Sequence, residues 1–270
     1  MTSPWIAALI ALFFWWFSTG AILVVVRYAD GFGSHAHRSA VWGSLPLGLL
    51  GVWGCIATID LTSVAGAYLA FLSVLSIWGW IELAFLTGII TGPMQRPCPD
   101  DVKGWERFLR AWGTVAYHEI LLAVILAIVV LYGQGGANLV GIWTYIILYF
   151  ARISAKLNLF LGVPKINTDF LSQSLSHLPS HFRIAPLNWL FPISITALSF
   201  AVACWLERLY HADTADGRVG FALLAAITGL ALIEHWFMVL PLPDERLWKW
   251  MLPTISTRPT TRHEDPAHGL

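Results

Sequence analysis

Seven long apolar runs divide this chain, and shorter polar or glycine- and proline-rich stretches separate them. The runs cover about residues 5–26, 41–59, 64–91, 108–132, 139–161, 189–206 and 219–240. Runs of about 18 or more apolar residues are long enough to cross the hydrocarbon core of a membrane as α-helices. The pattern therefore predicts an all-α, polytopic helix bundle with about seven transmembrane helices, and Pro46 predicts a kink in the second.

The links between these runs predict a simple organisation. The sequence shows neither an internal repeat nor a second domain, so we expect residues 1–253 to form a single transmembrane domain. Residues 244–252 are typical of an interfacial amphipathic segment, and residues 254–270 of a disordered tail. We expect His35 and His37 in the first link to be solvated. We also interpret His177 and His181 as surface histidines, because Pro179 between them argues against a regular helix.

Charge indicates the orientation. Of the 16 Lys and Arg residues, all but Arg208 and Arg218 fall on one side of the predicted spans. Since Lys and Arg favour the cytoplasmic side, the N-terminus is predicted to be periplasmic and the C-terminus cytoplasmic. The chain is 57% hydrophobic and 12% charged with zero net charge, so nothing in its charge points to nucleic acid. The three cysteines lack metal-type spacing and are expected to be free thiols.

Polar residues inside the apolar runs are the candidate functional residues. Arg152 and Lys156 are four residues apart, so a helix places them on one face. A cation within the hydrocarbon costs at least about 2.5–3.5 kcal/mol and normally has a partner. We expect one intramembrane polar core, at similar depth in the cytoplasmic half, formed by Glu82, His118, Glu119, Arg152, Lys156, Asn158, Glu234 and His235.

Three interpretations of this core remain open from the residues alone. It could be an ion network that fixes helix packing, or a pigment site in which His118 or His235 ligates the magnesium of a chlorin. It could also be a metal site, with iron held by Glu82, His118, Glu119, Glu234 and His235. Adjacent residues such as His118 and Glu119 point about 100° apart on a helix, which disfavours two ligands to one ion. The chain contains no P-loop, dinucleotide fingerprint, GxSxG or HExxH motif.

Five segments carry a resemblance to a known family: WGWIELAFLTG, AWGTVAYHE, ARISAKLNLFLGVPKIN, HFRIAPLNWLFPIS and EHWFMVLPLPDERLWKWML. Together they resemble the PuhE-type putative photosynthetic complex assembly proteins of purple phototrophic bacteria, over about residues 60–253. The resemblance implies a multi-pass protein of the bacterial inner (intracytoplasmic) membrane, whose gene accompanies that of the reaction-centre H subunit. It carries over no catalytic residues.

The resemblance favours a factor for bacteriochlorophyll supply or for assembly of the reaction-centre and light-harvesting complex. Its expected partners are membrane lipid, photosynthetic complex subunits, and pigment or pigment-synthesis enzymes, and bacteriochlorophyll or a precursor is the implied ligand. The alternative is a membrane metalloenzyme or cyclase subunit of bacteriochlorophyll biosynthesis with an intramembrane Glu/His iron site. Whether the protein is an enzyme stays open. A transporter is disfavoured, because inverted repeats and broken half-helices are not visible.

Overall fold

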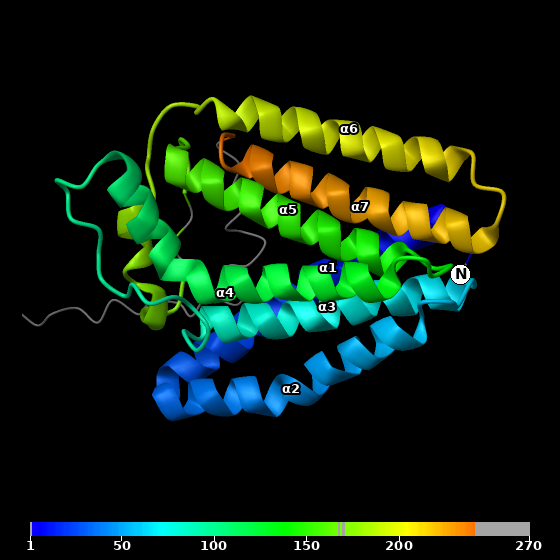
Figure 1. Ribbon diagram of the computed structural model, residues 1–270, viewed down its shortest axis with the longest axis horizontal. Coiled ribbons are helices and arrows are strands. Elements are labelled where there is room, and N and C mark those ends of the chain that lie inside the picture. The colour runs from blue at the N-terminus through cyan, green and yellow to red at the C-terminus, as the bar shows by residue number, and fades with distance from the viewer. Residues whose placement is uncertain (1, 167, 169–170, 241–270) are drawn as a thin grey trace, which may run out of the picture.

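The computed structural model describes residues 2–166, 168 and 171–240 (Figure 1). Its helices are α1 (Pro4–Phe32), α2 (Ser34–Ala57), α3 (Val64–Leu86), α4 (Gly104–Gly133), α5 (Val140–Leu161), α6 (Leu190–Tyr210) and α7 (Ala215–Phe237). Two 3₁₀ helices, η1 (Gln173–Leu175) and η2 (Leu178–His181), lie in the link before α6. All seven α-helices are long and apolar enough to cross a membrane, and no β-strand occurs in the described residues. The predicted all-α, seven-span class is confirmed.

The seven helices form one bundle in which α7 is central. It packs against α1, α3, α5 and α6, while α2 packs on α3 and α1, and α4 packs on α5 (Figure 1). The outward surface is rich in large apolar side chains; on α1 these include Trp5, Leu9, Phe13 and Phe17. Such a surface suits lipid rather than water, so the protein is a multi-pass membrane protein whose outer faces contact lipid.

Small residues on α2 allow close packing against α3. A Cβ on Gly51 would lie 2.6 Å from the Ser73 carbonyl oxygen, and one on Gly54 would lie 2.1 Å from Ser73 Oγ. Gly51 therefore cannot accept a larger residue without separating the helices, whereas a larger residue at Gly54 requires the Ser73 side chain to move. Pro46 lies inside α2 and removes a backbone donor, and Figure 1 shows α2 bending along its length, as the sequence predicts.

The first link differs from its prediction, because it is helical. α1 continues to Phe32 and α2 begins at Ser34, so that Gly33 alone, at φ 81°, changes the chain direction. A link of one residue brings the last turn of α1 against the first turn of α2. His37 Nε2 thereby lies 2.9 Å from Asp30 Oδ1 and is only 7% exposed, so its predicted solvation is wrong, whereas His35 is exposed as expected.

The third span is also shorter than predicted, since α3 ends at Leu86 instead of residue 91. Gly88 at φ 79° terminates the helix, and the amides of Ile89 and Ile90 donate to the Ala84 carbonyl. The chain then runs along α4, where a Cβ on Gly92 would lie 2.1 Å from the Gly113 oxygen. This irregular segment is hydrogen-bonded to α4, because the His118 amide donates to the Thr91 carbonyl and the Met94 amide donates to the Gly113 carbonyl. The predicted amphipathic segment 244–252 and the tail 254–270 lie outside the described residues.

Candidate functional site

Helix α5 carries two cations that pair with carboxylates on two other helices. Arg152 Nη1 lies 2.9 Å from Glu82 Oε1 on α3, and Lys156 Nζ donates a hydrogen bond to Glu119 Oε1 on α4. Both cations also lie over the ring of Phe85, at 5.4 Å for Arg152 and 5.0 Å for Lys156. The i,i+4 spacing thus places both cations on the same face of α5, from which they join α5 to α3 and α4.

His118 lies directly behind this ion cluster. Its Nε2 is 3.8 Å from Glu82 Oε1 and 3.9 Å from Glu119 Oε1, and its ring centroid is 4.4 Å from that of Phe85. These distances are too long for hydrogen bonds. The side chain is fully buried, and neither ring nitrogen has a hydrogen-bond partner among the described residues. Five of the eight predicted core residues therefore lie together in one cluster: Glu82, His118, Glu119, Arg152 and Lys156.

The opposite face of α5 carries a second, uncharged network that includes Asn158 and His235. Ser154 Oγ lies 2.8 Å from His235 Nε2 on α7 and 2.8 Å from Ser194 Oγ on α6. Asn158 Nδ2 donates to Ser194 Oγ at 3.0 Å, and Asn188 Nδ2 donates to Asn158 Oδ1 at 3.1 Å. Ser154, Ser194 and Asn188 also belong to this network, although they were not among the predicted core residues. The i,i+4 spacing of Ser154 and Asn158 was the available signal.

The two core histidines have different surroundings. His235 Nδ1 lies 2.8 Å from the Ala231 carbonyl oxygen, which only accepts, so Nδ1 carries the proton. The other ring nitrogen, Nε2, contacts the Ser154 hydroxyl. Both nitrogens of His235 are therefore engaged, whereas both nitrogens of His118 are available.

Glu234 lies in neither network. Its side chain is exposed and no other described residue forms an ion pair with it within 4 Å, although Arg152 lies within electrostatic range. Since His235 faces α5 and α6, the adjacent position on α7 points elsewhere, as the 100° helical step requires. The structure thus places seven of the eight residues in two groups on opposite faces of α5, and Glu234 lies outside both.

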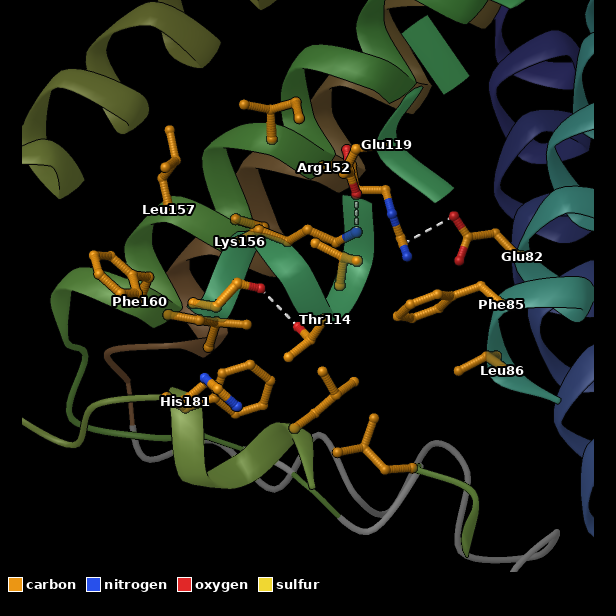
Figure 2. Close-up of a pocket in the computed structure, with 18 of the residues that line it drawn as sticks. Glu82, Phe85, Leu86, Thr114, Glu119, Arg152, Lys156, Leu157, Phe160 and His181 are labelled. Carbon is orange, nitrogen blue, oxygen red and sulfur yellow. Dashed lines mark hydrogen bonds and ion pairs between the residues drawn. The ribbon is translucent and has the colours of Figure 1, made fainter. Parts of the chain in front are cut away.

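A cavity of about 500 Å³ adjoins the ion cluster (Figure 2). Its walls come from α1, α3, α4, α5 and the link before α6, and most of them are apolar. The charged part of the wall is formed by Arg152, Lys156, Glu82 and Glu119, and Thr19, Thr114 and His181 are the other polar lining residues. Cavities of this size and character are typical small-molecule sites.

The far end of this cavity is closed by the link before α6. His181 lies there, opposite Arg152 and Glu82 in Figure 2, and Arg107 Nη2 donates to its carbonyl oxygen at 2.8 Å. His177 and His181 are 7% and 2% exposed, so their interpretation as surface histidines is wrong. Burial lowers the pKa of both rings below the usual value of 6.5. As expected, no regular α-helix runs through both histidines, because Pro179 lies in the short 3₁₀ helix η2; the link nevertheless folds back onto the bundle and buries both rings.

Comparison with known proteins identifies the family. A family profile described as "Protein of unknown function (DUF3623)" matches residues 1–259. The chain belongs to this family. It is also 52% identical, over all 270 of its residues and 96% of the relative, to the "Uncharacterized 30.4 kDa protein in puhA 5'region" of Rhodobacter capsulatus. No solved structure matches the chain.

For this DUF3623 member, the arrangement favours a polar wall over a metal centre. No group of three His, Cys, Asp or Glu side chains in the described parts of the chain is arranged to hold a metal ion. Glu82 and Glu119 are already paired with cations, which oppose the approach of a further positive charge. Of the predicted metal ligands, Glu234 and His235 lie outside the group that contains Glu82, His118 and Glu119.

Proposed function

We propose that this protein is a PuhE-type inner-membrane factor for bacteriochlorophyll supply or for assembly of the photosynthetic reaction-centre and light-harvesting complex. The observation that carries the proposal is the cavity of about 500 Å³ within the helix bundle, which is mostly apolar and has a charged group of side chains on one side. A pigment or pigment precursor has a large apolar body and a few polar groups, which this cavity matches. The position of the Rhodobacter capsulatus relative in the puhA 5′ region supports a role in photosynthesis.

His118 is the better placed of the two histidines to ligate a chlorin magnesium. Its nitrogens have no hydrogen-bond partner in the described residues, whereas His235 uses both of its own. Phe85 lines the cavity and packs against the His118 ring, so a rotation of Phe85 would open the route. We expect His118→Ala to impair function more than His235→Ala if pigment is ligated here.

A deletion strain tests the proposal. The gene is removed in a purple phototrophic bacterium and restored in trans as the wild type or as the His118 and His235 variants. We expect the deletion to change bacteriochlorophyll content or the timing of complex accumulation after a shift to phototrophic conditions, while respiratory growth stays normal. Absorption spectra through the shift measure this. Wild-type spectra in the deletion strain at every time point would refute the proposal.

The alternative of an iron enzyme has less support, because Glu82 and Glu119 are occupied by cations. Elemental analysis of protein purified in mild detergent distinguishes the two. Stoichiometric iron that is lost in Glu119→Gln would favour the enzyme, and a bound chlorin absorption band would favour the pigment factor.

A further inference from the structure

The polar wall of the cavity is asymmetric in charge. The side chains of Arg152 and Lys156 are 22% and 25% exposed, whereas those of Glu82 and Glu119 are 12% and 2% exposed. All four side chains line the cavity, and the two cations are more exposed than the two carboxylates. A molecule in the cavity meets positive charge first, although the cluster as a whole is close to neutral.

The cation–carboxylate pairs have different consequences for the empty cavity and for the occupied one. With no ligand, Glu82 and Glu119 neutralise the two cations and keep the bundle stable. Lys156 has three donor protons and Arg152 has five, so one contact with a carboxylate does not use all the donors of either side chain. Arg152 Nε has no hydrogen-bond partner among the described residues. Spare donors in low-dielectric surroundings favour an anionic acceptor.

The remainder of the cavity defines the rest of the ligand. Phe85, Leu157 and Phe160 line it beside the cations, and Trp112 and Leu178 lie farther along. From these contacts we infer that the cavity binds an apolar molecule bearing a free carboxylate, and that Arg152 and Lys156 select the acid over its ester. This rests on the proposed function only for the source of the ligand, which would be a tetrapyrrole with an unesterified propionate. A fatty acid has the same chemistry.

A matched pair of probes tests the selection. The purified full-length protein in mild detergent is titrated with pheophorbide a and with its methyl ester, and binding is followed by quenching of tryptophan fluorescence. A charge-assisted hydrogen bond contributes about 1.5–3 kcal/mol. We therefore expect the acid to bind roughly 10- to 100-fold more tightly than the ester. Equal affinity for acid and ester, or binding of neither, would overturn the inference.

Two variants should move the acid-to-ester ratio in opposite directions. Glu119→Met with Lys156→Met removes one cavity-facing cation together with its counter-ion, and should lower the ratio at least about tenfold. Glu119→Gln leaves Lys156 without its hydrogen-bonded carboxylate and should raise the ratio. Arg208→Gln, at the far end of α6, is the control and should leave the ratio unchanged. Should the double variant fail to fold, Glu119→Gln decides alone, and a ratio that does not rise overturns the inference.

Competition with oleate assigns the source. If oleate displaces pheophorbide a and loses affinity in the double variant, the inference holds and the ligand is a fatty acid. If oleate does not compete, the inference holds for the tetrapyrrole acid. Wild-type pigment in the deletion strain together with acid-selective binding would refute the proposed function and leave the inference standing. Changed pigment in the deletion strain together with equal binding of acid and ester would support the proposed function and refute the inference.

Discussion

Replacement of Arg152 by Met tests whether the ion cluster stabilises the bundle. Methionine fills similar space without charge, so the main loss is the counter-ion of Glu82, whose carboxylate lies 2.9 Å away. Removing one partner of a fully buried pair costs about 3–5 kcal/mol. Because the Arg152 side chain keeps 22% of its exposure, we expect a smaller cost, about 2–4 kcal/mol. A cost of about 2.8 kcal/mol lowers the ratio of folded to unfolded protein roughly 100-fold.

The double variant Glu82→Met/Arg152→Met is the matched comparison. It removes both charges, so no carboxylate is left unpaired, and it should be within about 1 kcal/mol of the wild type. Unfolding in mild detergent is followed by tryptophan fluorescence, for which the chain offers 15 tryptophans, with Arg208→Met as the control. Arg152→Met with wild-type stability would show that Arg152 has no stabilising partner. A double variant as unstable as the single would show that the charge pair is not the cause.

Three further predictions test the topology, the cavity end and the neutral network. Alkaline phosphatase, which is active only in the periplasm, should be active when fused after residues 135 and 212 and inactive when fused after residues 98 and 260. Most Lys and Arg residues lie on the side of residues 98 and 260, which is therefore predicted to be cytoplasmic. Activity after residue 98 or 260 would contradict this orientation. Burial, aided by Arg107 and Arg110, lowers the pKa of His181 below 6.5, so the unfolded state gains its proton first on acidification. The free energy of unfolding should therefore fall below about pH 6.5, by up to about 1.4 kcal/mol per pH unit, and it should fall less steeply in His181→Gln. An equal slope in His181→Gln and the wild type would show that His181 does not cause the pH dependence. Asn188→Ala removes the acceptor for the Leu190 and Phe191 amides and should cost about 1–2 kcal/mol in chemical unfolding, whereas an unchanged midpoint would show that the cap is dispensable.

The sequence predicted the number and type of the helices because hydropathy reports which segments avoid water. It could not predict how each helix is rotated about its axis, since lipid and protein interior are equally apolar. The pairs His118–Glu119 and Glu234–His235 show the difference. Both residues of the first pair face the ion cluster, because α3 lies on one side of α4 and α5 on the other. In the second pair only His235 faces a partner helix.

The boundary errors have a different physical origin. α1 ends just before Gly33 and α3 ends just before Gly88, and both glycines have positive φ values that other residues rarely adopt. Hydropathy does not reveal the end of α3, because apolar residues both precede and follow Gly88. The burial of His37, His177 and His181 depends on contacts with residues elsewhere in the fold, such as the 3.2 Å contact of His181 Nε2 with the Arg96 carbonyl. Local polarity predicts exposure only when a link leaves the bundle, and these links lie against it.

The central position of α7 bears on how the protein is made. This helix is the last of the seven to leave the ribosome, yet it contacts α1, α3, α5 and α6. Until it arrives, the six earlier helices enclose no complete core, and Ser154 on α5 lacks its contact with His235. Nascent chains must therefore wait in the bilayer as a loose assembly that closes only when translation is nearly finished. Chains that stop before residue 215 should be recognised by membrane proteases, so the cell accumulates whole copies of this protein and few fragments.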